Sequence, residues 1–346
     1  PNTGVRWEMT TEYNVGVDFS FFNNRLTGSI DVYHRYTDGA LAPAPHILES
    51  GFKSYYSNII DMTNNGVEVN IGGDIIRSKN FGWNTNFNIA ANRNKVKRLN
   101  GATISAGMQD AYIEGMPAGT LKGYKVKGIC QDLSELEALN ATSPSGIYQT
   151  NTGVGDYIMQ DIDGNGMIDV NDRVVIANPE PKCFGGWLNT LTYKDFALSF
   201  LLQYQFGGEA LYSNLQTDMG GALGQSVLRE LYGNTWTTEN TNARYPQLVF
   251  MGRESYNLTD NDRYVFKTSY LRMKNITLSY KLPQAMTSKW GVNNASVFAT
   301  VTNLFTITNW PGLDPESIGT IVTQMSSSSD PYPMSRTFSL GVKVQF

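Results

Sequence analysis

The chain contains few of the residues on which enzymatic chemistry most often depends. Among 346 residues there are two histidines and two cysteines, and the sequence has no GxSxG, HExxH or Walker-type segment. Cys130 and Cys183 lie too far apart for a CxxC metal site. They are either free thiols or one disulfide, and we expect free thiols. This composition predicts a protein that is not an enzyme.

Long apolar runs and basic blocks are also missing. No stretch reaches the ~18 apolar residues of a membrane-spanning helix, which excludes a helical membrane protein. The mean hydropathy of −0.30 does not exclude a β-barrel, because a barrel strand presents only alternate residues to lipid. A net charge of −4 without a basic block argues against nucleic acid as a partner.

The last ten residues alternate between apolar and polar side chains. Phe338, Leu340, Val342, Val344 and Phe346 form one row, and the residues between them form a more polar row. Such a strand must pair into a sheet, since an unpaired strand leaves its backbone groups unsatisfied. It is either the edge strand of a soluble sandwich or the last strand of a transmembrane barrel, whose apolar row faces lipid.

Strand-like segments recur in pairs along the chain. The clearest pair alternates over 13–21 and 26–32 around Asn23-Asn24, which favours a tight turn. Four further pairs are predicted at 67–71 with 83–89, on either side of 116–119, around Lys194-Asp195, and at 270–280 with 295–303. With the final strand they make about eleven strands, whereas closed single-chain bacterial barrels have an even number.

Long polar stretches separate the pairs, near 38–65, 95–110, 130–182, 207–268 and 304–334. Two of them contain helical patterns, at 134–140 and 221–232, and we expect neither to form a domain. Loops of this length are uncommon in a compact sandwich, whereas outer-membrane barrels carry long extracellular loops. The pattern favours an all-β protein with an antiparallel transmembrane β-barrel. The odd strand number, and a start at Pro1 without a signal peptide, indicate part of a larger barrel.

Seven segments, in the same order, resemble SusC/RagA-like TonB-dependent transporters of the Bacteroidetes outer membrane. They are WEMTTEYNVG (7–16), FFNNRLTG (21–28), NNGVE (64–68), GYKVKGI (123–129), DIDGNGMID (161–169), NPEPK (178–182) and SYLRMKNI (269–276). The resemblance implies that residues 1–346 are the C-terminal part of a barrel of about 22 strands, with the N-terminal plug and first strands absent. Cys130 departs from the family, which often has an aromatic residue there.

The resemblance also implies a function and partners. Members of the family import oligomeric nutrients, glycans or peptides, across the outer membrane, and their N-terminal part contacts TonB. A SusD-like surface lipoprotein covers the extracellular mouth, and outer-membrane lipid surrounds the barrel. The alternative is a surface glycan- or protein-binding, adhesin-like β-domain without import. A plug of about a hundred residues upstream in the complete gene would separate the two.

The sharpest local motif is DIDGNGMIDVND at 161–172. Oxygen ligands at positions 1, 3, 5, 9 and 12, glycine at 6 and a backbone carbonyl at 7 reproduce the EF-hand calcium loop. The predicted Ca²⁺ ligands are the side chains of Asp161, Asp163, Asn165, Asp169 and Asp172 and the carbonyl of Met167. Position 12 is Asp rather than Glu, and no obvious helices flank the loop. The alternative is an acidic loop of Asx turns without a metal.

Other candidate residues give no catalytic set. We expect His34 to be a hydrogen-bonded histidine of the barrel wall, and Glu135 and Glu137 to lie on a solvated helical face. Aromatic residues of the long loops either stack on a sugar or peptide substrate or pack loop against loop. They are Tyr55, Tyr56, Tyr112, Tyr148, Tyr212 and Trp236. The sequence does not identify the substrate-binding residues.

Overall fold

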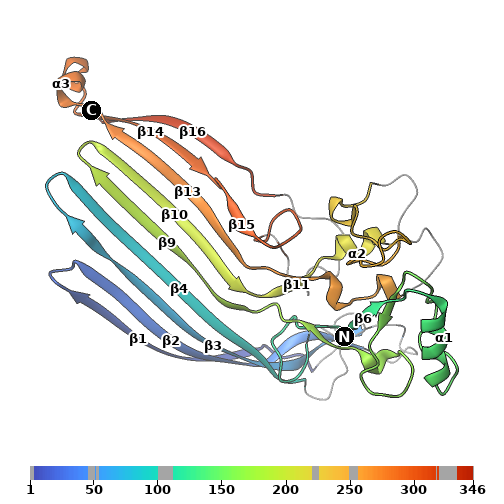
Figure 1. The fold of residues 1–346 in the computed structure, drawn as a ribbon. Helices are drawn as coiled ribbons and strands as arrows, with labels where there is room; N and C mark the ends of the chain where they lie inside the picture. Colours follow the sequence, from blue (N-terminus) through green and yellow to red (C-terminus); the bar gives the residue numbers. More distant parts are fainter. Residues whose placement is uncertain are drawn as a thin grey trace.

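A computed structural model describes residues 4–45, 51, 54–99, 112–219, 226–248, 256–316, 318 and 333–345. Its main feature is one long, curved antiparallel sheet with a folded group of loops at one end (Figure 1). The strands follow in the order β1 (Met9–Phe21), β2 (Leu26–Pro45), β3 (Ser54–Arg77), β4 (Phe81–Arg98), β9 (Pro181–Tyr193), β10 (Phe196–Gly207), β13 (Tyr270–Lys281), β14 (Asn294–Thr302) and β16 (Thr337–Gln345). The short β15 (Thr306–Thr308) pairs with β13.

The first hairpin has the predicted register. Val15 pairs with Val32 and Val17 with Ile30, so the apolar residues of both strands share one face. The turn holds Asn23 and Asn24 at φ 55° and 63°, a left-handed conformation that asparagine tolerates better than most residues. The hairpins β3–β4, β9–β10 and β13–β14 are also confirmed, with their turns at or next to the predicted residues.

The predicted strand pair around 116–119 is wrong. The Val96 N–H donates to the Met116 carbonyl at 2.8 Å, and Gly115 donates to the Val96 carbonyl at 2.8 Å, so this segment folds onto the end of β4. β4 pairs directly with β9. The described sheet therefore has ten strands, including β15, and not eleven.

Most of the predicted loop at 38–65 is also strand. β2 continues to Pro45 and β3 begins at Ser54, with a bulge near Gly39 at φ 66°. Ala40, Ala42 and Ala44 are buried here against Ile60 and Val96. Alanine and proline are weak strand formers, so the residues of this segment did not predict a strand. The pairing of β2 with β3 is stabilised here by burial of the alanines.

The loops at the end of the sheet pack into a unit of their own, called the loop unit here. It contains β5 (Leu121–Gly123) with β8 (Val174–Ala177), β6 (Val126–Ile129) with β7 (Tyr157–Met159), β11 (Glu209–Leu211) with β12 (Val265–Lys267), and the helices α1 (Leu133–Thr142) and α2 (Ser213–Met219). Single 3-10 turns are η2 (Val170–Asp172), η3 (Arg229–Leu231), η4 (Tyr256–Leu258) and η5 (Asp262–Tyr264). Near the opposite end of the sheet lie α3 (Gln284–Thr287) and the 3-10 turn η6 (Ser288–Trp290).

The core of the loop unit is aromatic and fully buried around Tyr157, Tyr245 and Tyr264. The unit is built jointly by several loops, because segments about a hundred residues apart bury one another, as Asp156 and Asn257 show. The helix predicted at 134–140 is α1. The one at 221–232 lies partly outside the described residues, and its described part is only the 3-10 turn at Arg229–Leu231.

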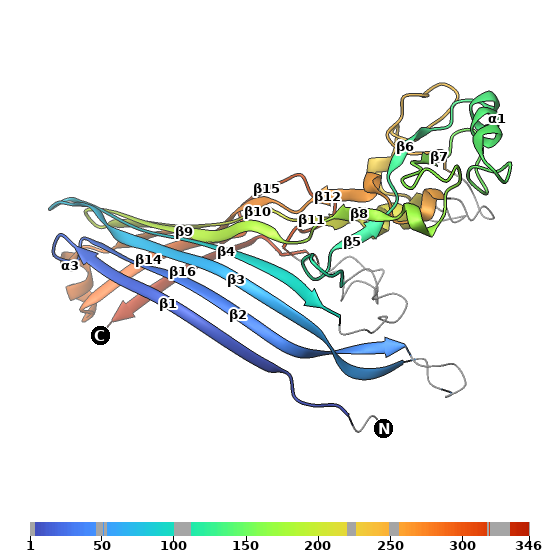
Figure 2. The same ribbon diagram turned by 90° about the horizontal axis from the view of Figure 1, so that it is seen from below.

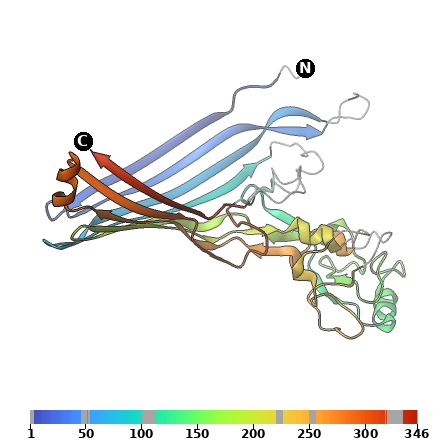
Figure 3. The same cartoon turned by 90° about the horizontal axis from the view of Figure 1, so that it is seen from above.

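The sheet is an open trough rather than a closed barrel. Within the described ranges, β1 pairs only with β2 and β16 only with β14. Figures 2 and 3 show β1 starting at the loop-unit end, while β16 finishes at the other end. These findings agree with the prediction of an incomplete wall. No described helix is both long and apolar enough to cross a membrane.

Candidate functional site

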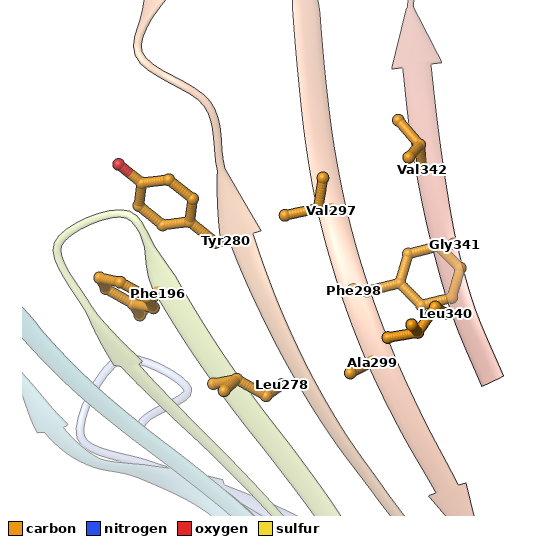
Figure 4. Close-up of a pocket in the computed structure, with 9 residues that line it drawn as sticks. All are labelled: Phe196, Leu278, Tyr280, Val297, Phe298, Ala299, Leu340, Gly341 and Val342. Atoms are coloured by element: carbon orange, nitrogen blue, oxygen red, sulfur yellow. The ribbon is translucent and has the colours of Figure 1, made fainter. Parts of the chain in front are cut away.

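The outer face of the sheet is largely apolar. On β16 the side chains of Phe338, Leu340, Val342 and Val344 are 71%, 88%, 65% and 43% exposed, which confirms the predicted row; Phe346 lies outside the described residues. Figure 4 shows Leu340 and Val342 beside Ala299 and Val297 of β14, with Leu278 of β13 on the other side of β14. An exposed apolar surface of this extent is typical of a protein face that contacts lipid.

The height of this apolar surface matches that of the lipid-facing band of an outer-membrane barrel. Along β10, Phe196, Leu198, Phe200, Leu202, Tyr204 and Phe206 alternate with Ala197, Ser199, Leu201, Gln203 and Gln205. Phe196 and Phe206 are ten residues apart, which spans about 25 Å along the membrane normal for a strand tilted by about 40°. At the end of the sheet away from the loop unit, the rings of Phe196 and Tyr280 pack together, with their centroids 4.5 Å apart. The apolar band of an outer-membrane barrel is also about 25 Å tall.

The inner face is polar over much of its area. The amide of Asn64 accepts hydrogen bonds from Asn92 and Asn94 at 3.2 and 3.0 Å, and the Tyr33 hydroxyl donates to Asn92 at 3.2 Å. These side chains lie on adjacent strands and hold one another in fixed orientations. Such a wall suits a water-filled lumen and provides amide groups for a polar solute.

A buried ionic cluster fixes a loop to this inner face. Arg272 of β13 donates from Nη2 to Asp314 at 2.6 Å and from Nη1 to Glu316 at 2.5 Å, and Lys274 donates to Glu316 at 2.9 Å. Burial alone would raise the pKa of the Asp314 carboxyl, but hydrogen bonds from Arg272 and from the N–H groups of Glu316 and Met334 outweigh it and lower that pKa. No sequence pattern predicted this cluster, although Arg272 and Lys274 of SYLRMKNI place two cations close together on one strand.

A pocket of about 460 Å³ lies on the same face next to the cluster. Its lining includes Gln203, Tyr270, Glu316, Asn88 and Phe184. The Gln203 amide donates to the Tyr270 hydroxyl at 3.1 Å and to Glu316 at 3.0 Å, so the polar groups are pre-positioned. Amide, carboxylate and aromatic groups together can bind either sugar hydroxyls or a peptide backbone.

The structure brings the predicted calcium ligands together in part. Asp161, Asp163 and Asp172 each place a carboxylate oxygen within 4.8 Å of the others. Asn165 and Asp169 lie beside them, joined by a hydrogen bond of 3.4 Å. Gly166 adopts φ 83°, the bend that the motif assigns to its sixth position.

Backbone donors shape the acidic loop. Asp172 is fully buried and accepts N–H groups of Ile162 and Asp169 at 2.7 and 2.8 Å. Burial would raise the pKa of Asp161, but the N–H groups of Gly166 and Gly164 donate to its carboxylate and lower that pKa. The carboxylates are thus pre-oriented for a hard cation. The turns are also the Asx turns of the metal-free alternative.

The remaining candidate residues have structural partners. His34 is exposed on the outer face and hydrogen bonds to Asn65 at 2.5 Å, as expected for a wall histidine. Glu135 accepts the Gln131 N–H at the start of α1. Cys130 is buried and Cys183 half-buried, and both are free, as predicted.

The predicted loop aromatics divide into two groups. Tyr148, Tyr212 and Trp236 are buried in the loop unit, so they pack loop against loop. Tyr55 and Tyr56 have exposed side chains, which leaves the substrate-stacking role as a prediction for this pair. Tyr112 is half-buried beside the alanines of β2.

Comparison with known proteins gives the same architecture. No family model matches the chain. It is 30% identical to the TonB-dependent receptor P3 of Formosa agariphila and 29% identical to the TonB-dependent receptor SusC of Bacteroides thetaiotaomicron, in both cases over 100% of the chain. It covers 35% and 32% of these relatives, so the chain spans about a third of their length. They are named as receptors and not as enzymes, in agreement with the prediction of no enzyme activity.

Solved structures share the fold. The structure of the RagAB peptide transporter matches 98% of the chain and 36% of its own chain with a TM-score of 0.76 and 23% identity. The open-open state of the RagAB peptide importer matches 99% of the chain and 35% of its own with a TM-score of 0.73 and 24% identity. The chain therefore corresponds over its whole length to about the C-terminal 35% of the SusC/RagA-like TonB-dependent receptors of the outer membrane, and its sheet matches part of their β-barrel wall.

Proposed function

We propose that this chain is part of an importer that carries oligomeric nutrients, glycans or peptides, across the outer membrane in a TonB-dependent manner. The observation that supports it most directly is the two-faced wall: apolar outside, polar inside, and joined at one end to a folded loop unit. This is the arrangement of a solute pathway through lipid. The fold shared with the RagAB peptide transporter supports the same assignment.

The proposal assigns the remaining steps to other parts of the assembly. The N-terminal part of the receptor would supply the plug, the first strands and the contact with TonB. A SusD-like lipoprotein would cover the loop-unit end. The substrate would contact the inner-face pocket around Gln203, Tyr270 and Glu316, whose amide and carboxylate groups suit either substrate class. The related RagAB structure is named a peptide transporter, whereas the name of the related SusC receptor states no substrate, so the proposal includes both glycans and peptides.

The test is uptake by living cells. The complete receptor gene would be deleted in its source bacterium, and labelled oligosaccharides and oligopeptides supplied to deleted and complemented cells. We expect accumulation only with the intact receptor, with TonB and with the lipoprotein gene. An adhesin-like domain would instead bind ligand at the surface without accumulation and without need of TonB, and that result would replace the import proposal.

We further propose that the loop at 161–172 binds Ca²⁺. The convergence of Asp161, Asp163 and Asp172 supports it, together with the left-handed glycine at position 6. The Met167 carbonyl, Asn165 and Asp169 would complete an oxygen shell, and bound Ca²⁺ would supply positive charge that cross-links the loop. The Tyr256 hydroxyl donates to the Ile168 carbonyl at 3.0 Å. The ion would therefore brace the loop unit.

A further inference from the structure

A second pocket, of about 790 Å³, lies at the end of the sheet that is next to the loop unit, called the upper end here. The pocket is called the rim pocket. Its charged lining residues are Arg93 of β4, Lys182 of β9, Lys267 of β12, Glu180 and Glu209. Phe206 also lines it, with its ring 50% exposed. The strands β4, β9, β10 and β13 are consecutive neighbours in the sheet. The pocket is therefore away from both open edges of the described wall.

The rim pocket faces the same side as the apolar band. Phe206 is the last member of the outward row of β10, and Arg93 continues the outward row of β4 that contains Phe87, Ile89 and Ala91. Glu209 and Lys267 are opposite one another in the β11–β12 pair, so they share a face. Because Phe206 marks the upper limit of an apolar band of about 25 Å, the pocket lies where lipid head groups begin.

The charged side chains of the rim pocket have donor and acceptor atoms that can bind a ligand. Arg93 donates from Nη1 to the Asn92 and Pro181 carbonyls at 2.7 and 3.0 Å and from Nη2 to the Lys182 carbonyl at 3.0 Å. These bonds do not use its Nε–H, which can donate to a ligand. Lys182 and Lys267 are exposed, and within the described ranges no hydrogen bond or ion pair involves the Nζ atom of either side chain. Glu180 accepts the Asn94 N–H with one oxygen, and Glu209 accepts the Asn178 N–H with one oxygen.

We propose that the rim pocket binds a membrane lipid whose head group carries a phosphate next to an ammonium, the chemistry of phosphoethanolamine. Arg93, Lys182 and Lys267 provide three cations for the phosphate, and the free oxygens of Glu180 and Glu209 accept the ammonium N–H groups. The acyl chains continue onto Phe206 and the apolar face below it. A purely anionic head group would leave the two carboxylates facing negative charge, which disfavours it.

This inference depends on the outer face contacting lipid and not on what the receptor imports. A receptor that failed in the uptake experiment would still bind the lipid, so the two tests fail independently. The head group occurs on glycerolipids and on modified glycolipids. The probes therefore include phosphatidylethanolamine and lipid A with and without phosphoethanolamine, and they distinguish these sources.

The experiment is native mass spectrometry of the complete receptor in detergent with one added lipid at a time. We expect phosphatidylethanolamine to bind several-fold better than phosphatidylglycerol or phosphatidylcholine, since the quaternary ammonium of phosphatidylcholine cannot donate a hydrogen bond. The double variant Lys182→Gln/Lys267→Gln should lose about tenfold in phosphatidylethanolamine binding. Glu209→Gln should retain phosphatidylglycerol binding and lose the preference for phosphatidylethanolamine. Lys194→Gln, at the opposite rim, is the matched control and should bind like the wild type.

Three results would overturn the proposal. The first is equal binding of the three glycerolipids. The second is an equal loss in the Lys194→Gln control and in the double variant. The third is binding of inorganic phosphate or glycerophosphoethanolamine as tight as that of the lipids, which would make the pocket a site for soluble anions. Heat-dependent migration on a gel confirms that each variant is folded before it is tested.

Discussion

Arg272 and Asp314 form a salt bridge of 2.6 Å between Nη2 and Oδ1, with their side chains only 3% and 2% exposed. Two charges this deeply buried are stabilising only because each is hydrogen-bonded by the other and by further partners. Arg272 also contacts Glu316 and Thr306, and Asp314 accepts the N–H groups of Glu316 and Met334. The pair therefore joins β13 to the segment that follows β15, on the inner face of the sheet.

Replacing one partner should destabilise the wall. For Asp314→Asn we expect a loss of about 3 kcal/mol in the free energy of unfolding, near the lower limit for breaking a buried pair, because Glu316 still neutralises Arg272. Urea unfolding of the complete receptor in detergent measures it. Glu12→Gln breaks the exposed pair with Arg35 on β1 and β2 and should cost less than about 1 kcal/mol. Equal losses in the two variants would contradict the role of burial.

The same pair predicts a pH dependence. The pKa of Asp314 is lower in the folded protein than its ordinary value of 3.8, so the folded state holds the proton less tightly than the unfolded state. The stabilisation is therefore complete above about pH 4 and decreases as the pH falls through the lowered pKa. The difference in unfolding free energy between wild type and Asp314→Asn should be constant from pH 7 to 5 and shrink towards pH 3. A difference that grows on acidification would contradict this assignment.

Local alternation predicted the parts of the fold that depend on neighbouring residues. The rows Tyr13, Val15 and Val17, and Phe338, Leu340 and Val342, identified strands because a lipid-facing strand needs an apolar residue at every second position. Turn chemistry at Asn23-Asn24 fixed the first register. Each of these patterns spans only a few residues of the chain, so the sequence alone was sufficient to predict the strands and the first turn.

The features that sequence analysis missed depend on distant contacts. Ala40, Ala42 and Ala44 become strand through burial against Ile60 and Val96, which no local pattern indicates. The loop unit forms because segments such as those of Asp156 and Asn257 meet. The Arg272–Asp314 pair joins residues 42 positions apart. The acidic loop could be identified as a candidate from its spacing, whereas the rim pocket combines strands whose adjacency only the sheet order reveals.

Gly341 provides a test of packing on the last strand. The ring of Phe298 lies over Gly341 in the cross-strand pair (Figure 4), and a Cβ on Gly341 would come within 2.3 Å of that ring. Gly341→Val should therefore displace the ring and cost about 1–3 kcal/mol. Gly128→Ala, where nothing lies within 4 Å of the new Cβ, is the control and should have little effect. Thermal unfolding followed on gels gives both values, and equal stability of the two variants would exclude the ring contact.

The two thiols should differ in reactivity. Cys130 is fully buried, burial raises its pKa, and its thiol donates to the Asp132 carbonyl at 3.2 Å. A thiol that stays protonated and covered reacts slowly. Peptide mass spectrometry after treatment with N-ethylmaleimide should find label on Cys183 and none on Cys130 in the folded receptor. In Cys183→Ser, Cys130 should be labelled only in urea, and labelling of Cys130 in this folded variant would show that the loop-unit core is open.

The calcium loop gives the last prediction. Binding of Ca²⁺ to the folded receptor alone should stabilise it by mass action, so the thermal midpoint of the loop unit should rise with Ca²⁺ concentration. Asp161→Asn/Asp163→Asn removes two carboxylate charges from the three that converge and should abolish this rise, as well as the luminescence of bound Tb³⁺ used as a probe. Glu137→Gln, which removes an exposed carboxylate of α1, is the control and should keep both signals. Mg²⁺ should not substitute, because it demands a tighter octahedral shell than this loop provides. If the thermal midpoint of the wild type does not change with Ca²⁺, or rises equally in the double variant, the loop is a set of Asx turns. Its carboxylates would then serve as acceptors for N–H groups of the loop, such as those of Gly164, Gly166 and Ile162.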